Sequence, residues 1–210
     1  MSAAGHGGGT GRGGEALAAA AAAFVVDDGM EYAAAKRKAA RDRSRHGERA
    51  GPLPSNEQLE AAVREHIVLF HNDTQPAELR ALRELALQWM ERLSTLRPHL
   101  GGAAWRGTAT RRSALHVDLY CDDPKVAEIE LLNRGLHFDV DLLHERPGQE
   151  PRSVLTLAAP CPALGETVTL HLCVRDLDEQ RGALKPDAQG RSWRGDAGAL
   201  RRLLATEPAA

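Results

Sequence analysis

Histidine and aspartate occupy the polar positions of three stretches in which apolar and polar side chains alternate. His116 and Asp118 lie two residues apart in "LHVDLY", His171 lies in "TVTLHLCV", and Asp139 and Asp141 lie in "LHFDVDLL". Side chains two positions apart on a strand share one face of a sheet. Imidazole and carboxylate groups bind metals and polar ligands, whereas they favour strands only weakly. The sequence therefore predicts a sheet face with a candidate site around His116, Asp118 and His171.

The same alternation is also expected of an ordinary two-layer domain, in which helices cover the apolar face and water covers the polar one. Convergence requires the strands that contain His116 and His171 to pair, about 4.8 Å apart. Periodicity alone does not specify that pairing, so a binding site and a solvated sheet face both stay open. A hydrolase triad of Ser113, His116 and Asp118 is disfavoured, because no nucleophile elbow surrounds the serine.

The first half of the chain has helical periodicity. Its glycine-rich start, residues 1–14, has nothing to bury and is predicted to be a disordered leader. Beyond it, Ser55 and Gln58 form a capping box, and apolar residues recur at helical spacing. Helices are predicted at residues 15–26, 31–43, 56–71 and 75–96.

After Gly102 the apolar period changes from about 3.6 residues to 2. Asp123 and Pro124 begin a further helix that Gly135 closes. Strands are predicted at residues 103–107, 115–121, 136–143, 153–159 and 166–174, with helices at 124–135 and 196–205.

These elements predict an α+β fold. A helical N-terminal region, residues 15–98, precedes an α+β domain at residues 99–206. We expect that domain to hold a mixed or antiparallel sheet with flanking helices.

Composition excludes several classes of function. The formal net charge is −2, so the whole chain is not drawn to nucleic acid or to an anionic membrane. The three cysteines form no C-x-x-C pair and follow no secretory segment, which indicates a reducing cytoplasm. No apolar run approaches the roughly 20 residues that cross a bilayer, so we expect no membrane role.

The segment "RGTATRRSALHVDL" resembles the signature of polymerase-beta-type nucleotidyltransferases, in which a strand, a Gly-Ser turn and a helix precede a strand with an Asp-x-Asp pattern. The resemblance equates Gly107 and Thr108 with the Gly-Ser pair, which would cradle phosphate. It equates His116 and Asp118 with the two carboxylates, and His171 with the third, which comes from a later strand. It implies a nucleotidyltransferase-like sheet, a nucleotide partner, and Mg²⁺ or Mn²⁺ as the metal.

A wider similarity runs from "EYAAAKRKAAR" to "DDPKVAEIELLNRG". It is to short bacterial proteins labelled nucleotidyltransferase-like, some of which carry the name UDP-N-acetylmuramate–alanine ligase. A Mur ligase needs a glycine-rich ATP loop ending in Gly-Lys-Thr or Gly-Lys-Ser, which this sequence lacks. The resemblance therefore implies nucleotidyltransferase chemistry rather than ligase chemistry.

Two of the three carboxylates that such enzymes use are histidines here. Mg²⁺ prefers oxygen ligands, and imidazole replaces them poorly. Three alternatives follow from this substitution: a degenerate, non-catalytic fold; a site adapted to a softer metal such as Mn²⁺ or Zn²⁺, with Asp118, His116 and His171 as ligands; or a set of carboxylates rebuilt with Asp139 or Asp141.

A basic segment at residues 36–49 carries seven basic residues against two acidic ones and begins with Lys36, Arg37, Lys38 and Arg41. A solvated helix face is the simplest explanation. The alternative function is a non-catalytic module that contacts a protein or RNA partner through this segment. Binding of DNA by a helix-turn-helix is less favoured, because "GPLP" follows where a recognition helix needs support.

Overall fold

The computed structural model describes residues 9–47, 52–143, 151–183, 190 and 192–207. Its contacts divide the chain into two units, residues 1–75 and 76–210. The predicted division lay at residues 98 and 99, whereas the helix that follows residue 75 contributes to the core of the second unit. Residues 1–8 of the predicted leader lie outside the described residues, and the rest of it belongs to the first helix.

The described residues of the first unit form three helices. They are α1 (Gly9–Val26), α2 (Tyr32–Arg45) and α3 (Asn56–Phe70). Small side chains of α1 and α2, such as Ala21 and Ala35, are fully buried against Leu59 and Val63 of α3. The predicted capping box at Ser55 and Gln58 is present with both of its hydrogen bonds, so it fixes the start of α3.

The second unit is an α+β domain, as predicted. Its elements are α4 (Gln75–Arg92), η1 (Ser94–Leu96), β1 (His99–Gly101), α5 (Gly102–Arg106), β2 (Leu115–Tyr120), α6 (Pro124–Asn133), β3 (Asp139–Leu143), β4 (Arg152–Cys161), η2 (Pro162–Leu164), β5 (Glu166–Arg175), η3 (Leu177–Glu179), α7 (Gln180–Ala183), β6 (Gly195–Asp196) and α8 (Ala197–Thr206). The predicted strand at residues 103–107 is wrong, because Ala103 to Arg106 lie in the short helix α5.

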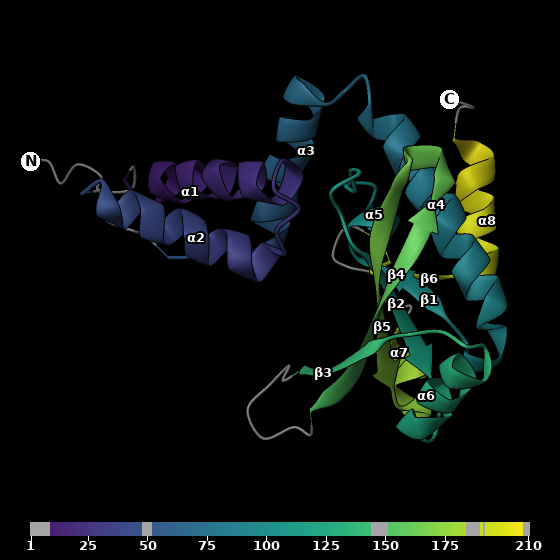
Figure 1. The fold of residues 1–210 in the computed structure, drawn as a ribbon. Helices are drawn as coiled ribbons and strands as arrows, with labels where there is room; N and C mark the ends of the chain where they lie inside the picture. The colour runs from purple at the N-terminus through teal and green to yellow at the C-terminus, as the bar shows by residue number, and fades with distance from the viewer. Residues whose placement is uncertain (1–8, 48–51, 144–150, 184–189, 191, 208–210) are drawn as a thin grey trace, which may run out of the picture. The chain divides into compact units, whose positions relative to one another are not determined.

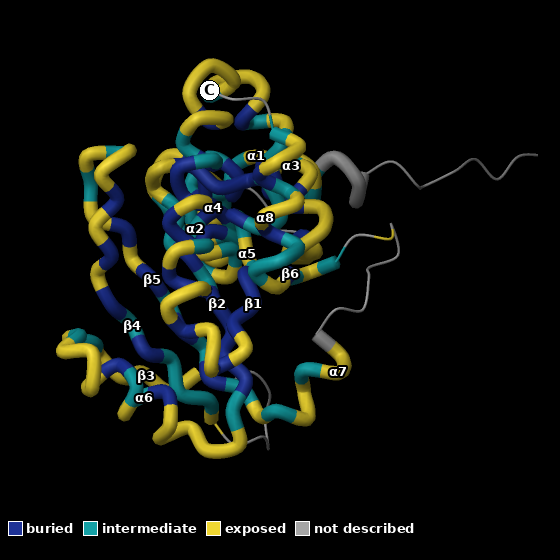
Figure 2. Tube along the Cα trace, turned by 90° about the vertical axis from the view of Figure 1, so that its right-hand side faces the viewer, coloured by how far each residue is buried: buried dark blue, intermediate teal, exposed yellow. Residues whose placement is uncertain are grey.

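The sheet is mixed, with the strand order β3-β4-β5-β2-β1-β6. The pair β2 and β5 is parallel, whereas the other neighbours are antiparallel. Helices α4 and α8 lie side by side along the sheet (Figure 1). Their apolar side chains share one core with Leu115, Val117 and Leu119 of β2. Strand β2 is buried along almost its whole length (Figure 2), so its polar face is also largely covered.

The described helices include none that is long and apolar enough to cross a membrane.

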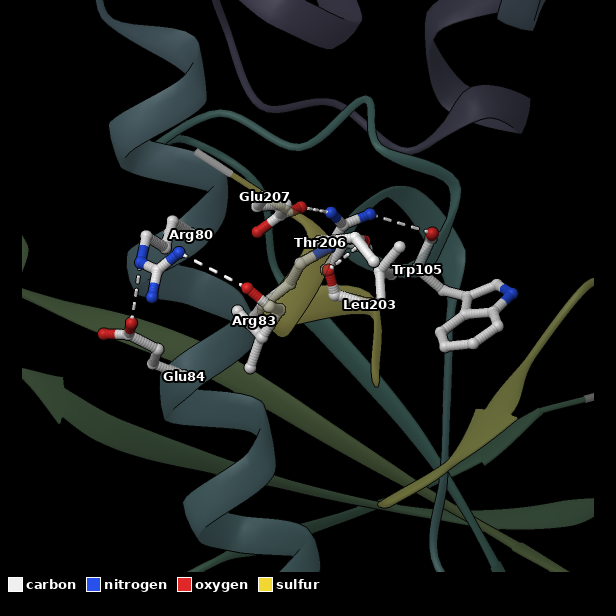
Figure 3. A network of polar contacts seen from close by, with 9 residues as sticks. Arg80, Arg83, Glu84, Trp105, Leu203, Thr206 and Glu207 are labelled. Atoms are coloured by element: carbon white, nitrogen blue, oxygen red, sulfur yellow. Dashed lines mark hydrogen bonds and ion pairs between the residues drawn. The ribbon is translucent and has the colours of Figure 1, made fainter. Parts of the chain in front are cut away.

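A buried arginine joins three elements of the second unit. Arg83 of α4 is 4% exposed and donates from Nε to the carbonyl of Ala104 at 2.8 Å and from Nη2 to that of Trp105 at 3.1 Å. Its Nη1 pairs with the carboxylate of Glu207, just beyond α8 (Figure 3). The carbonyls at the end of a helix lack partners within that helix. Arg83 thus supplies donors to α5 and holds it against α4 and the C-terminus of α8.

The substitution Arg83→Leu should lower the free energy of unfolding by about 2–4 kcal/mol, because it leaves buried carbonyls and a carboxylate without their donor. Urea denaturation measures this loss. Arg80→Leu is the control on the same helix, since the Arg80 side chain is 29% exposed, pairs with Glu84 and makes only a long 3.5 Å contact with the carbonyl of Leu204 (Figure 3). A cost below about 1 kcal/mol is expected there. Equal losses in the two variants would contradict the role given to Arg83.

Candidate functional site

The parallel pairing of β2 with β5 places His116 directly beside His171. Their rings stack, with centroids 5.0 Å apart and an interplanar angle of 28°. In the same register Asp118 lies beside Cys173, so His116, Asp118 and His171 occupy one face of the sheet. On the neighbouring strand β4, the hydroxyl of Thr156 is 3.0 Å from Nδ1 of His171. The structure therefore brings together the three residues that the sequence singled out.

Asp118 is bound by two arginines. Nε of Arg175, at the end of β5, lies 2.8 Å from its Oδ1, and Nη1 of Arg194, just before β6, lies 3.0 Å from its Oδ2. Only 8% of Asp118 is exposed, so these ion pairs are largely shielded from water. Both oxygens of the carboxylate are thus occupied by cations of the protein itself.

Tyr120 and His99 extend this polar face. Nη1 of Arg194 donates to the hydroxyl of Tyr120 at 3.1 Å. The His99 ring meets the Tyr120 ring edge-on, with centroids 5.1 Å apart, and His99 faces Asp118 across the β1–β2 ladder. Burial raises the pKa of the Tyr120 hydroxyl, and the negative charge of Asp118 raises it further. Arg194, held by two partners, is therefore fixed in orientation over the sheet.

Sequence reasoning missed Arg175 and Arg194, and it placed Tyr120 on the polar face of its strand without giving it a role. A signal existed for Arg175, because it continues the series His171, Cys173 at the next position on the same face of β5. Arg194 lies in a segment without periodicity, so only the tertiary fold brings it to Asp118.

The glycine turn beside His116 is Gly101-Gly102, between β1 and α5. Gly101 is the partner of His116 across the ladder, and a Cβ added at Gly102 would lie 3.2 Å from Cδ2 of His116. Gly102 has φ +62, in the left-handed region that side chains disfavour. Strand β1, the glycine pair, helix α5 and strand β2 are thus consecutive along the chain. In space, the glycine pair lies next to His116 of β2.

Gly107 and Thr108, the residues predicted to cradle phosphate, lie at the other end of α5. Gly107 is the left-handed cap of that helix, and the Thr108 N–H bonds the carbonyl of Ala103. The side chain of Thr108 is buried, and its Oγ1 has no hydrogen-bond partner among the described residues. The role of these two residues stays a prediction.

Asp139 and Asp141 share the polar face but lie far from Asp118. Asp139 pairs with Thr156 of β4, which in turn pairs with His171 of β5. Three strand spacings of about 4.8 Å separate β3 from β2, which is about 14 Å, more than two aspartate side chains can span. Asp139 instead lines a hollow of about 490 Å³ with His137, Thr156 and Thr169. A metal site built jointly from Asp118 and either aspartate does not fit this geometry.

The side chains around Asp118 also do not offer the ligands that a pair of Mg²⁺ ions needs. Such ions need several carboxylate oxygens with nothing else bound to them. Here one carboxylate is paired with two guanidinium groups, and the adjoining side chains are the imidazoles of His116 and His171. This part of the sheet is suited to holding an anion rather than two hard cations.

The basic segment is partly engaged within the first unit. Nζ of Lys36 donates to the carbonyl of Pro54 and to Oδ1 of Asn56, both at 2.7 Å. Lys38 pairs with Asp28 at 3.0 Å and lies over the ring of Phe24. Arg37 and Arg41 are exposed on α2. Two of the four predicted contact residues thus have structural partners.

Comparison with protein-family models gave no match, and comparison with curated proteins gave none. Solved structures of Cid1 poly(U) polymerase show a partial likeness. The complex with the UTP analog UMPNPP has 15% sequence identity and a TM-score of 0.31, over 49% of this chain and 31% of that one. The MgGTP-bound form and the complex with the short product ApU each have 16% identity and a TM-score of 0.31. This chain spans about a third of these structures, and a likeness of this extent identifies no activity.

Gly102→Ala should lower the free energy of unfolding by about 2–3 kcal/mol, because it adds a crowded Cβ to the cost of a positive φ. Gly165→Ala is the matched control: Gly165 has φ +65, but a Cβ there meets nothing within 4 Å. It should cost only about 1 kcal/mol. Proton NMR should also show shifted His116 and His171 ring signals in Gly102→Ala alone. Unchanged ring signals in that variant would show that Gly102 does not affect the position of the His116 ring.

The Tyr120 hydroxyl should ionise above the pH range of an ordinary tyrosine, because burial raises its pKa. Because its folded pKa is raised, the neutral hydroxyl contributes stability that is fully present below about pH 10 and is lost as pH rises through the folded pKa. Alkaline titration followed by tyrosinate absorbance should show a late step that Tyr120→Phe removes and Tyr32→Phe retains. A late step that survives in Tyr120→Phe would contradict this assignment.

Proposed function

We propose that the second unit is a nucleotidyltransferase-like domain that binds the phosphates of a nucleotide through arginine and histidine side chains, without a two-metal centre. The observation that carries the proposal is the pairing of both Asp118 oxygens with Arg175 and Arg194. In the enzymes that the sequence resembles, carboxylates at these positions hold the metals that contact the triphosphate. Guanidinium groups can contact phosphate oxygens directly.

Arg194 supports this proposal further. Its Nη1 is held by Asp118 and Tyr120, while its Nε is buried and has no hydrogen-bond partner in the described part of the chain. A buried donor without an acceptor is costly, and such groups are uncommon in folded proteins. The Arg194 side chain is 25% exposed, so a phosphate oxygen can reach the exposed part of its guanidinium group. The stacked imidazoles of His116 and His171 lie on the same face and offer further donors.

The arrangement favours binding over transfer. Nucleotidyl transfer needs the charge that develops on the triphosphate to be neutralised by metal ions held on carboxylates. Asp118 is already neutralised, and Asp139 and Asp141 are too distant to replace the missing acids. A degenerate site that binds a nucleotide is thus the function that the geometry supports best.

The three cysteines are free, which fits a reducing compartment such as the cytoplasm.

A protein or RNA partner for residues 36–49 stays a separate prediction. Lys36 and Lys38 make contacts within the chain, and no further observation favours this alternative.

Calorimetric titration of the full chain with each of the four nucleoside triphosphates tests the proposal, with Mg²⁺ in one series and EDTA in the other. We expect at least one nucleotide to bind with affinities that agree within about twofold in the two series. Arg194→Gln should weaken binding roughly tenfold or more, as loss of a charge-assisted hydrogen bond does. Arg201→Gln is the control, because Arg201 pairs with Glu91 on the exposed surface of α8 and α4.

Two results would overturn the proposal. One is the absence of heat with every nucleotide in both series. The other is nucleotide binding that requires Mg²⁺ and is abolished by Asp118→Asn. That result would indicate that Asp118 holds a metal ion. Circular dichroism of each variant confirms that an altered affinity does not reflect unfolding.

A further inference from the structure

Three side chains converge at one end of the first unit, away from the residues discussed above. Asp27 directly follows α1, His66 lies within α3, and His71 is the C-terminal cap of α3. Nε2 of His71 is 2.8 Å from Oδ1 of Asp27, and Nε2 of His66 is 3.2 Å from Oδ2. One metal-ligating atom from each residue lies within 4.8 Å of the other two. Both imidazoles thus point their Nε2 atoms at the carboxylate of Asp27.

The end of α3 makes this convergence attainable. Residues five positions apart on an ideal helix differ by about 140° in direction, so their side chains do not face the same point. His71 leaves helical geometry, with φ −132 and ψ 12, and its ring centroid is 5.9 Å from that of His66. The backbone hydrogen bond from the His71 N–H to the carbonyl of Ile67 fixes this turn. The two imidazoles are therefore positioned by the fold rather than by a flexible loop.

We infer that Asp27, His66 and His71 form a binding site for a borderline divalent metal ion, with Zn²⁺ as the ion of choice. Zinc binds imidazole nitrogen and carboxylate oxygen at about 2.0–2.2 Å in tetrahedral geometry, which spaces ligand atoms roughly 3.3 Å apart. The nitrogen-to-oxygen distances of 2.8 and 3.2 Å are close to that spacing. Two imidazoles select zinc and its neighbours in the transition series over Mg²⁺ and Ca²⁺.

The surroundings leave this cluster accessible and keep its carboxylate available. The side chains of Asp27, His66 and His71 are 47%, 16% and 30% exposed, so an ion can enter from solvent. The adjacent carboxylate, Asp28, is instead paired with Lys38 at 3.0 Å. Three protein ligands leave the fourth tetrahedral position for water. A bound ion would join the end of α1 to the end of α3 and stabilise the first unit.

Titration of the untagged, EDTA-treated full chain with Zn²⁺ against a chromophoric chelator tests this inference. We expect one ion per chain, a rise in melting temperature with Zn²⁺ but not with Mg²⁺, and the intense visible absorption of tetrahedral Co²⁺ when cobalt replaces zinc. The inference would be overturned if the chain without substitutions bound zinc weakly, with no defined stoichiometry, and gave no tetrahedral cobalt spectrum.

Variants locate the site. His66→Ala, His71→Ala and Asp27→Asn should each weaken zinc binding about tenfold or more and reduce the rise in melting temperature at a fixed zinc concentration, since each removes one direct ligand. His46→Ala and Asp28→Asn are the matched controls, because they remove an exposed imidazole and a neighbouring carboxylate of the same unit. Both should bind zinc as the unmodified chain does. Full affinity in His66→Ala and His71→Ala would place the ion elsewhere.

Discussion

The arrangement of the candidate site depends on the parallel pairing of β2 with β5. On the apolar face this pairing sets Leu115 against Leu170 and Val117 against Leu172, all of them buried in the core beneath α4 and α8. Because the side-chain period of a strand is two, a slip of one residue would move these side chains to the other face. Hydrophobic packing on one face therefore fixes which polar residues meet on the other. The stacked histidines are a consequence of how the core packs.

The Asp118 carboxylate differs from a metal-binding aspartate in the groups that surround it. An aspartate in a metal-dependent transferase attracts cations because the protein leaves its charge uncompensated. Here Arg175 and Arg194 compensate that charge within a largely buried setting, and they would have to be displaced before an ion could bind. The compensation also orders two guanidinium groups over the sheet, and guanidinium groups can contact phosphate oxygens directly. The imidazoles of His116 and His171 on the same face are likewise poor ligands for a hard cation.

The sequence predicted strands β2 to β5 and most helices, because alternation and capping are local signals, but it missed the short strands β1 and β6. Strands β2 and β5 were predicted almost to the residue, and the cap at Ser55 was predicted correctly. The predicted strand at 103–107 was wrong because a run of two alanines and a tryptophan is too short to separate periods of 2 and 3.6. Strand order and the contacts of Arg194 are set by tertiary packing, which leaves no local pattern. The convergence of Asp27 with His66 and His71 likewise joins residues about forty positions apart, so spacing alone did not indicate it.

The two histidine-aspartate clusters differ in what surrounds them rather than in their composition. At Asp27 the carboxylate faces two imidazoles, and a neutral imidazole can coordinate a cation. At Asp118 it faces guanidinium groups, which stay charged at any accessible pH and repel one. Arginine next to a carboxylate thus favours an anion, whereas histidine leaves the carboxylate open to metals. The identity of the base opposite each aspartate is the feature from which the chemistry of the two clusters follows.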